Sequence, residues 1–216
     1  MSTARVRYQT IEFGEIDIHL RTLRDRQQYS DPHGLAEDLG ISSALWPIFG
    51  MVWPSSLVMS HFMLDFDFKT KSVLEIGCGI GLTSLLLNHL KVDISATDYH
   101  PEVEAFLENN VQINGGKKIP YERLDWQNDL KANRQFDVIV GSDLLYEDDH
   151  IFLLANFIER HAKPQCEVII VDPGRGRHGK FSRKMQQLGF SASKKRSLKT
   201  DFIEPPFKGW ILEYAR

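Results

Sequence analysis

The chain has 216 residues, 42% hydrophobic and 25% charged, which is the composition of an ordinary globular protein. Its formal net charge of -3 argues against a dedicated nucleic-acid-binding protein, which normally carries a large positive excess. Two cysteines are too few for a disulfide framework, and the 8 histidines show no metal-ligand spacing, so no metal is expected. Since no signal peptide or membrane-spanning run is present, we expect a soluble, cytoplasmic protein, monomeric and without a membrane partner.

The first 25 residues alternate between apolar and polar side chains on both sides of Phe13-Gly14-Glu15, which predicts a β-hairpin. Residues 26–50 show little periodicity and contain breakers such as His33-Gly34. Pro54 then opens a helix, because proline is favoured in a first helical turn. We therefore divide the chain into an N-terminal hairpin and extension (1–50) and one compact domain (51–216).

From Lys71 onward strands and helices alternate, which predicts right-handed crossovers and a doubly wound, mostly parallel α/β sheet. The expected strands are Ser72–Ile76, Val92–Thr97, Tyr121–Leu124, Phe136–Gly141 and Glu167–Val171, and the expected helices are Gly81–Leu90, Pro101–Asn114, Asp149–His161 and Lys180–Leu188. The last two strands, Phe190–Ser197 and Trp210–Tyr214, have no clear helix between them and are expected to form an antiparallel pair at the sheet edge.

A glycine-rich loop joins the first strand of this sheet to its helix. Glycines there allow positive φ and a close approach of the backbone to a ligand. Asp98 follows the next strand, where a carboxylate can accept hydrogen bonds from both ribose hydroxyls of a nucleoside cofactor. On its own such a loop can also be a turn that binds nothing, or a nicotinamide site.

The pattern of this loop differs from the dinucleotide fingerprint, because its third glycine comes one position early. It reads E-x-G-x-G-x-G, with Glu75, Gly77, Gly79 and Gly81, and it resembles motif I of class I S-adenosylmethionine methyltransferases. The resemblance implies a Rossmann-like seven-strand fold. It also implies S-adenosyl-L-methionine as the cofactor, with the loop against its amino-acid part and Asp98 on the ribose.

Two further segments lie where strands of the predicted sheet end, which is where ligands bind in such folds. After the third strand, Asp125 is placed to accept a bond from the adenine amino group and Trp126 to pack on the ring. A solvated aspartate and a core tryptophan are the alternative interpretation. After the fourth strand, Asp143 and Tyr146 are expected beside the transferable methyl group.

The set formed by Trp53-Pro54, Asp125-Trp126 and Asp143-x-x-Tyr146 is similar to that of the protein lysine methyltransferases grouped as methyltransferase family 16. The resemblance covers roughly residues 45–175. It implies a lysine side chain of a protein as substrate, Trp53 over the methionine end of the cofactor, and Ser142 in the cofactor site. The later stretch from Asp172 to Arg175 resembles bacterial-type lysine methyltransferases related to those acting on electron-transfer flavoprotein. It lies at the substrate mouth or is a flexible loop.

Methyl transfer to lysine needs a neutral amine, whose usual pKa is about 10.4. The enzyme must bind, desolvate and align it, and Asp143 is the candidate to orient it, with Tyr146 offering a hydroxyl or an aromatic face. A helix cap is the structural alternative for Asp143. Other functions left open are a small-molecule N-methyltransferase of the nicotinamide type and a cofactor-binding module without catalysis. RNA methylation is disfavoured, because the fourth strand lacks the Asn/Asp-Pro-Pro-Tyr motif.

Overall fold

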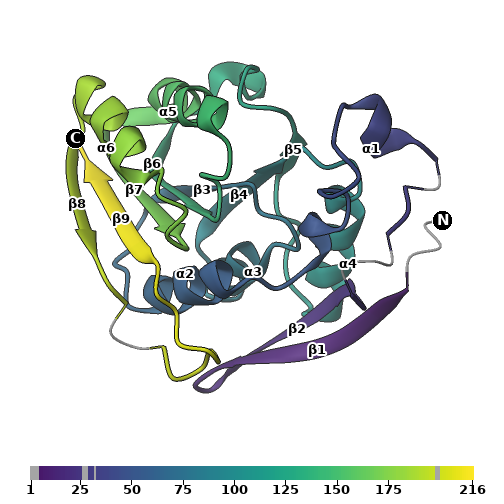
Figure 1. The fold of residues 1–216 in the computed structure, drawn as a ribbon. Helices are drawn as coiled ribbons and strands as arrows, with labels where there is room; N and C mark the ends of the chain where they lie inside the picture. Colours follow the sequence, from purple (N-terminus) through teal and green to yellow (C-terminus); the bar gives the residue numbers. More distant parts are fainter. Residues whose placement is uncertain (1–4, 26–28, 32, 198–199) are drawn as a thin grey trace.

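The computed structural model describes residues 5–25, 29–31, 33–197 and 200–216. A seven-stranded sheet forms its centre (Figure 1). Its strands are β3 (Ser72–Ile76), β4 (Asp93–Asp98), β5 (Tyr121–Arg123), β6 (Phe136–Ser142), β7 (Ala162–Asp172), β8 (Ser191–Lys195) and β9 (Trp210–Ala215). Their spatial order is β5-β4-β3-β6-β7-β9-β8. The first five strands in this order run parallel, so their carboxyl ends share one edge of the sheet.

Helices cover both faces of the sheet, as the doubly wound prediction requires (Figure 1). One face packs against α2 (Pro54–Leu64), α3 (Leu82–His89) and α4 (Val103–Ile113), and the other against α5 (Asp148–His161) and α6 (His178–Gln187). Along β6, Val138 and Val140 join the first core whereas Ile139 joins the second, because successive strand residues point to opposite faces. The central strands are therefore apolar on both sides.

The antiparallel pair predicted at the sheet edge is confirmed. β9 pairs antiparallel with β8, and it also pairs antiparallel with β7, so that β9 lies between them and β8 forms the edge. Among the described residues 200–209 there is no helix, which agrees with the sequence. No helix within the described ranges is long and apolar enough to cross a membrane.

The predicted hairpin is present as β1 (Val6–Phe13) and β2 (Ile16–Leu23), which form a separate antiparallel sheet. Its buried residues Ile18 and Leu20 belong to the same core as α3 and α4. The outer edge of β2 is closed by side chains of α4. The Asn110 Oδ1 accepts a hydrogen bond from the backbone N–H of Arg21 at 2.7 Å, and the Asn114 Oδ1 accepts one from that of His19 at 2.8 Å.

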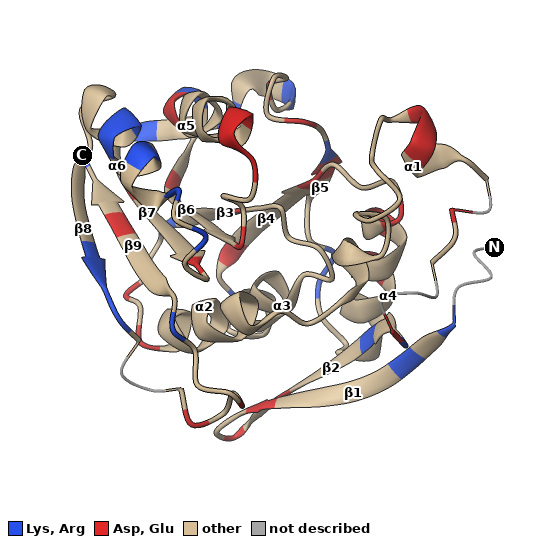
Figure 2. Ribbon diagram, viewed as in Figure 1, with Lys and Arg blue, Asp and Glu red and all other residues tan. Residues whose placement is uncertain are grey.

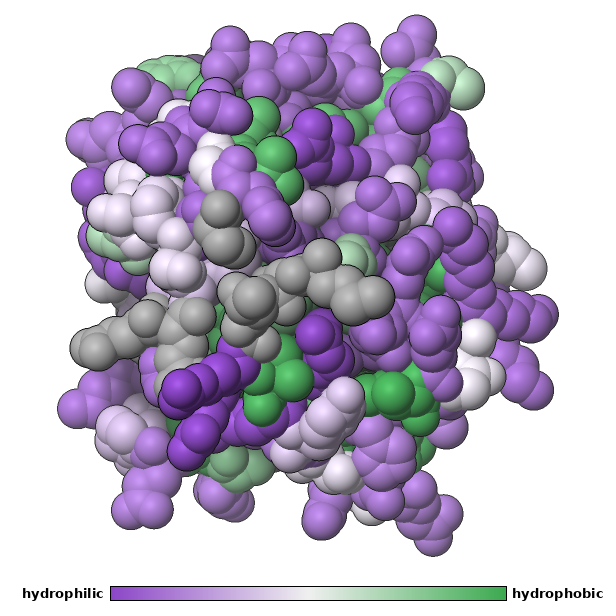
Figure 3. Space-filling view, turned by 90° about the vertical axis from the view of Figure 1, so that its right-hand side faces the viewer, coloured by the Kyte–Doolittle hydropathy of each residue, from purple (hydrophilic) through white to green (hydrophobic). Residues whose placement is uncertain are grey.

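The rest of the N-terminal segment contains two short elements, α1 (Leu35–Asp38) and the 3-10 turn η1 (Ile48–Gly50). Figure 3 looks onto the side of the molecule that carries α1, and it shows a mainly polar surface with small separate apolar patches. Pro54 opens α2 as expected, in the first turn of that helix. The hairpin and the extension therefore reach the sheet through packing against its helices.

Several elements differ from the sequence prediction, including α6, which begins at His178, and β8, which ends at Lys195. β7 begins at Ala162, directly after α5, because Ala162 already pairs with Phe136; the polar residues that follow give no strand pattern. α4 begins at Val103 and not at Pro101, because the carboxylate of Asp98 accepts a hydrogen bond from the His100 N–H and holds the preceding residues in a turn. A short 3-10 turn, η2 (Lys131–Asn133), was not predicted.

Candidate functional site

The glycine-rich loop between β3 and α3 requires its glycines. Gly77, Gly79 and Gly81 have φ values of 61°, 54° and 78°, a region that residues with a side chain rarely adopt. A Cβ atom at Gly79 would lie 3.0 Å from the backbone oxygen of Phe49, and one at Gly81 would lie 2.4 Å from a side-chain carbon of Leu107. These positions therefore require glycine for their backbone conformation and for the close packing of neighbouring residues against them.

Glu75 lies at the base of this loop and is almost fully buried. Its Oε2 accepts hydrogen bonds from the backbone N–H and the hydroxyl of Ser84, at 2.8 and 2.5 Å. Burial raises the pKa of this carboxyl to about 7, although the bonds from Ser84 act in the opposite direction. Glu75 thus fixes the first turn of α3 against the end of β3, and its predicted contact with the cofactor stays a prediction.

Asp98 brings the loop and the end of β4 together. Its Oδ2 accepts a hydrogen bond from the Gly79 N–H at 2.8 Å, and its Oδ1 accepts one from the His100 N–H at 2.9 Å. Burial raises the pKa of Asp98, and the backbone donors lower it. Each carboxylate oxygen can accept more than one hydrogen bond, so the predicted role on a ribose is compatible with these contacts.

The N-terminal extension covers the loop and the end of β4, which sequence reasoning missed. The ring of Phe49 stacks on His100 with 4.1 Å between centroids, and Tyr29 packs edge-on against both. The hydroxyl of Tyr99 donates to the backbone oxygen of Leu39 at 2.7 Å. Tyr99 directly follows Asp98, and this position was the available sign that it belongs to the site.

A cavity of about 330 Å³ opens beside the ends of β4 and β5. It is lined by Leu39, Tyr99, Leu124 and Asp125, among others. Asp125 Oδ1 accepts hydrogen bonds from the backbone N–H groups of the two residues that follow Trp126, which fixes its turn. Trp126 does not line this cavity. Its ring packs against the core under α5 and contacts His150 edge-on, with 5.2 Å between centroids.

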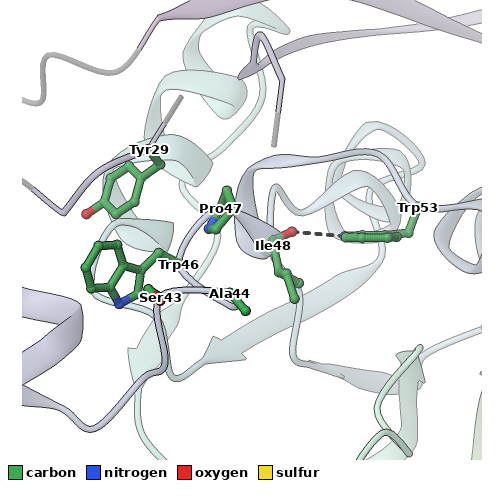
Figure 4. A pocket seen from close by; sticks show the side chains of 7 residues that line it. All are labelled: Tyr29, Ser43, Ala44, Trp46, Pro47, Ile48 and Trp53. Carbon is green, nitrogen blue, oxygen red and sulfur yellow. Dashed lines mark hydrogen bonds between the residues drawn. The ribbon is translucent and has the colours of Figure 1, made fainter. Parts of the chain in front are cut away.

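A second cavity of about 420 Å³ lies within the extension and reaches Trp53. Its aromatic lining consists of Tyr29, Trp46 and Trp53 (Figure 4). The indole N–H of Trp53 donates to the backbone oxygen of Ile48 at 2.9 Å, which sets the ring beside η1 at the start of α2 (Figure 4). The predicted position of Trp53 over the methionine end of the cofactor stays a prediction.

Asp143 follows Ser142, the last residue of β6, with φ at 56°. Aspartate adopts this left-handed conformation more readily than most residues with a side chain, and strained backbone of this kind clusters at active sites. Its backbone N–H donates to the oxygen of Val171 at 2.9 Å, so the backbone is held against the end of β7. The carboxylate accepts two hydrogen bonds from the guanidinium of Arg175, from Nε at 2.8 Å and from Nη2 at 3.0 Å.

Tyr146 stands next to this ion pair, and its ring packs edge-on against His150 with 4.7 Å between centroids. The side chain is 37% exposed, so the ring reaches the surface. Burial, with the charges of Asp98, Glu147 and Asp143, raises the pKa of Tyr146 to about 12 and keeps the phenol protonated at neutral pH. Three acidic residues, Glu147, Asp148 and Asp149, also follow one another at the start of α5, where the ribbon is red in Figure 2.

The carboxyl edge of the sheet thus brings together the glycine-rich loop, Asp98, Asp143 and Tyr146, as predicted. Arg175 comes from the Asp172–Arg175 stretch that the sequence placed at the substrate mouth, but its pairing with Asp143 was not foreseen. Within the ranges that the structure covers, no group of three or more His, Cys, Asp or Glu residues is arranged to hold a metal ion.

The fold is that of the seven-strand S-adenosylmethionine-dependent methyltransferases. A solved structure titled as the Thermus thermophilus 16S rRNA N2 G1207 methyltransferase (RsmC) with AdoMet and guanosine matches 99% of this chain and 51% of that chain. Its TM-score is 0.67 at 14% identity. The ribosomal protein L11 methylase of Lactobacillus delbrueckii matches with a TM-score of 0.56 at 20% identity, over 76% of each chain.

Within this class, residues 37–188 match the model of the lysine methyltransferase family, and the chain belongs to that family. The bovine protein-lysine methyltransferase METTL21E is 31% identical over 134 residues, which are 56% of this chain and 45% of that protein. A histidine protein methyltransferase 1 homolog of Dictyostelium discoideum is 37% identical over 119 residues, 51% of this chain and 38% of that protein. The chain spans about half the length of the relatives it matches.

Proposed function

We propose that the protein transfers a methyl group from S-adenosylmethionine to a lysine side chain of a protein substrate. The observation that carries this proposal is the arrangement at the carboxyl edge of the sheet. The backbone of the glycine-rich loop bonds to Asp98, and two strands away Asp143 and Tyr146 face the same edge. Membership of the lysine methyltransferase family supports the lysine side chain over other nucleophiles.

The residues of the loop fit a nucleoside cofactor with an amino-acid tail. The glycines hold the positive φ values of the turn between β3 and α3, and the Gly79 N–H is bonded to Asp98. We assign the free lone pairs of Asp98 to the ribose and the cavity at Asp125 to the adenine. We assign the amino-acid part to the loop and the methionine end to Trp53, with Glu75, Trp126 and Ser142 as supporting residues.

The cofactor supplies an electrophilic methyl group on a positively charged sulfur. The residues of this chain must supply a neutral, aligned amine, because an ammonium has no lone pair for the displacement. We assign the alignment to Asp143, whose carboxylate accepts a hydrogen bond from the amine. Tyr146 has a protonated phenol and an exposed ring, and it offers the amine either a hydroxyl oxygen or an aromatic face. Water takes the proton that the ammonium loses.

Two other methyl acceptors are compared with lysine in the test. The Dictyostelium relative is named as a histidine methyltransferase, and imidazole nitrogen is also a nucleophile. A small amine of the nicotinamide type would use the same cofactor site. The two cysteines are free and buried, which suits an enzyme of a reducing compartment and is the support for an intracellular substrate.

The test incubates the purified protein and methyl-labelled S-adenosylmethionine with a cell lysate. The labelled residue is then identified by mass spectrometry. We expect label on lysine of a protein. Label on histidine or on a small molecule replaces the proposal, and no label with intact cofactor binding indicates a binding module.

The matched variants are Asp143→Asn, just beyond the end of β6, and Asp137→Asn, whose half-buried side chain lies near the start of that strand. We expect Asp143→Asn to lower kcat/KM by about tenfold to a hundredfold, because hydrogen bonds to charged groups contribute about 1.5–3 kcal/mol. Its affinity for S-adenosylhomocysteine should be kept. Asp137 accepts hydrogen bonds from Ser72 and Lys163 at the opposite end of β6, so its variant should change stability and not turnover. Full turnover in Asp143→Asn would make Asp143 a structural residue.

A further inference from the structure

The guanidinium of Arg175 occupies the carboxylate that the proposed function assigns to the substrate amine. Both oxygens of Asp143 are bonded, at 2.8 and 3.0 Å, in the parallel two-point geometry typical of arginine and carboxylate. The two partners differ in exposure. The side chain of Asp143 is 15% exposed and that of Arg175 is 44% exposed. The carboxylate is therefore the fixed member of the pair and the guanidinium the accessible one.

The site around this pair carries more negative than positive charge. Ser142 pairs with Val171 across β6 and β7, so Asp143 and Asp172 occupy the next positions on the two strands. Asp172 is fully buried, and its Oδ1 has no hydrogen-bond partner. The charges of Asp143 and Asp172 both act on Arg175, and His178 Nδ1 lies 3.9 Å from Asp172 Oδ2. The carboxylates of Asp143 and Asp172 favour a cation at this place.

The backbone that carries Arg175 has a glycine on each side of it. Gly174 and Gly176 flank it with φ values of 98° and 83°, and a Cβ at either position would have open space around it. The Gly174 N–H donates to Asp172 Oδ2 at 3.0 Å, and α6 begins only at His178. Glycine has more accessible conformations than any other residue, so this segment can reposition the arginine at low cost.

We propose that Arg175 stands in for the substrate's ammonium group, and that the lysine of the substrate displaces it from Asp143 on binding. This rests on the proposed function, in which Asp143 orients the amine. The guanidinium bonds to both oxygens of Asp143, so a substrate ammonium competes with it for the same carboxylate. A partly exposed ion pair changes an equilibrium constant by about fivefold or less, so the exchange is accessible to a substrate.

The inference is tested first without turnover, by NMR titration of n-butylammonium into the full-length protein with S-adenosylhomocysteine. Arg175→Ala should bind this cation about fivefold more tightly than the wild type, and Arg175→Gln should do the same with the hydrogen-bonding side chain retained. Asp143→Asn should abolish the binding. The matched control is Arg177→Ala, because Arg177 bonds to Asp148 from the same loop; this variant should bind like the wild type. Equal binding by the wild type and both Arg175 variants overturns the proposal.

Once the substrate protein has been identified, kinetics give a second test. If its lysine displaces Arg175 from Asp143, Arg175→Ala should have a lower KM and an unchanged kcat. A permanent role of the guanidinium beside the bound amine predicts the reverse, a loss of kcat that added methylguanidinium restores, and this result overturns the exchange. Failure of the proposed function looks different. In that case the wild type methylates no lysine, whereas the titration still reports whether Arg175 blocks a cation site at Asp143.

Discussion

Two regions at the carboxyl edge of the sheet are built in different ways. The cofactor edge (Glu75 to Gly81, with Asp98) is buried and is joined by hydrogen bonds to backbone N–H groups. The substrate mouth (Ser142 to Tyr146, with Gly174 and Arg175) is more exposed and is joined by an ion pair between side chains from two loops. Changes at the cofactor edge should therefore alter stability and cofactor binding together, whereas changes at the mouth should alter turnover alone.

The largest effect is expected at Glu75, through pH. Its pKa is raised from 4.5 to about 7 by burial, so the folded protein holds this proton more tightly than the unfolded chain. Between pH 4.5 and 7 the unfolded chain releases the proton first, and the free energy of unfolding falls as pH rises, by about 3 kcal/mol over this range. Glu75→Gln should remove this slope, measured by urea denaturation at pH 5 and pH 8.

The control for Glu75 is Glu12→Gln, a change of the same kind at an exposed position of the hairpin. It should leave the pH slope of the wild type in place. The contrary outcome is that Glu75→Gln and the wild type lose equal amounts of stability between pH 5 and pH 8. In that case the Glu75 carboxyl does not cause the pH dependence of the free energy of unfolding. The cofactor edge is then less strongly coupled to folding than its burial indicates.

Asp98→Ala should lower the affinity for S-adenosylhomocysteine by about tenfold to a hundredfold, since the ribose loses a charged acceptor and the loop loses its bond from the Gly79 N–H. Titration calorimetry measures this directly. Asp93→Ala, at the exposed start of the same strand, is the matched control and should bind normally. An unchanged dissociation constant in folded Asp98→Ala protein would refute the ribose assignment and leave Asp98 as a structural link.

The hairpin should act on the cofactor edge through Asn110. This buried side chain accepts a bond from the Arg21 N–H and donates one to the backbone oxygen of Ile80 at 3.1 Å, within the glycine-rich loop. Asn110→Ala leaves both backbone groups unpaired and should cost about 2 kcal/mol of stability, with weaker cofactor binding. The exposed neighbour Asn109→Ala should do neither. Loss of stability with normal cofactor affinity would show that the hairpin stabilises the fold without affecting cofactor binding.

The contrast also explains what could be predicted from the sequence. Gly77, Gly79 and Gly81 were recognisable because the backbone conformation itself demands glycine, and Asp98 because its place at a strand end is set by the alternation of strands and helices. Neither inference needed a tertiary contact. The mostly parallel sheet and its antiparallel edge followed from the same local patterns, because apolar strands and amphipathic helices are visible in short windows.

The contacts that close the site were out of reach for the same physical reason. Phe49 meets His100 and Leu39 meets Tyr99 across more than 50 positions of sequence, and the extension has no periodicity that would place it. At the substrate mouth both loops were identified, yet the ion pair between Asp143 and Arg175 depends on the register of β6 against β7. Side-chain pairing between loops leaves no local pattern in a single sequence.

The smallest effect is expected at Tyr146, and it tests whether the mouth is independent of the fold. The ring is 37% exposed and packs on His150, so removing the hydroxyl should leave stability within about 0.5 kcal/mol of the wild type. If the hydroxyl accepts a bond from the amine, Tyr146→Phe should lower kcat/KM several-fold. If the ring faces the ammonium, Tyr146→Phe should keep most of the activity and Tyr146→Leu should lose it. Comparing kcat/KM with melting temperature for both variants decides between hydroxyl and ring. Cofactor affinity should stay constant in both, because Tyr146 lies on the substrate side; weaker cofactor binding in Tyr146→Phe would mean that the mouth and the cofactor edge act as one site.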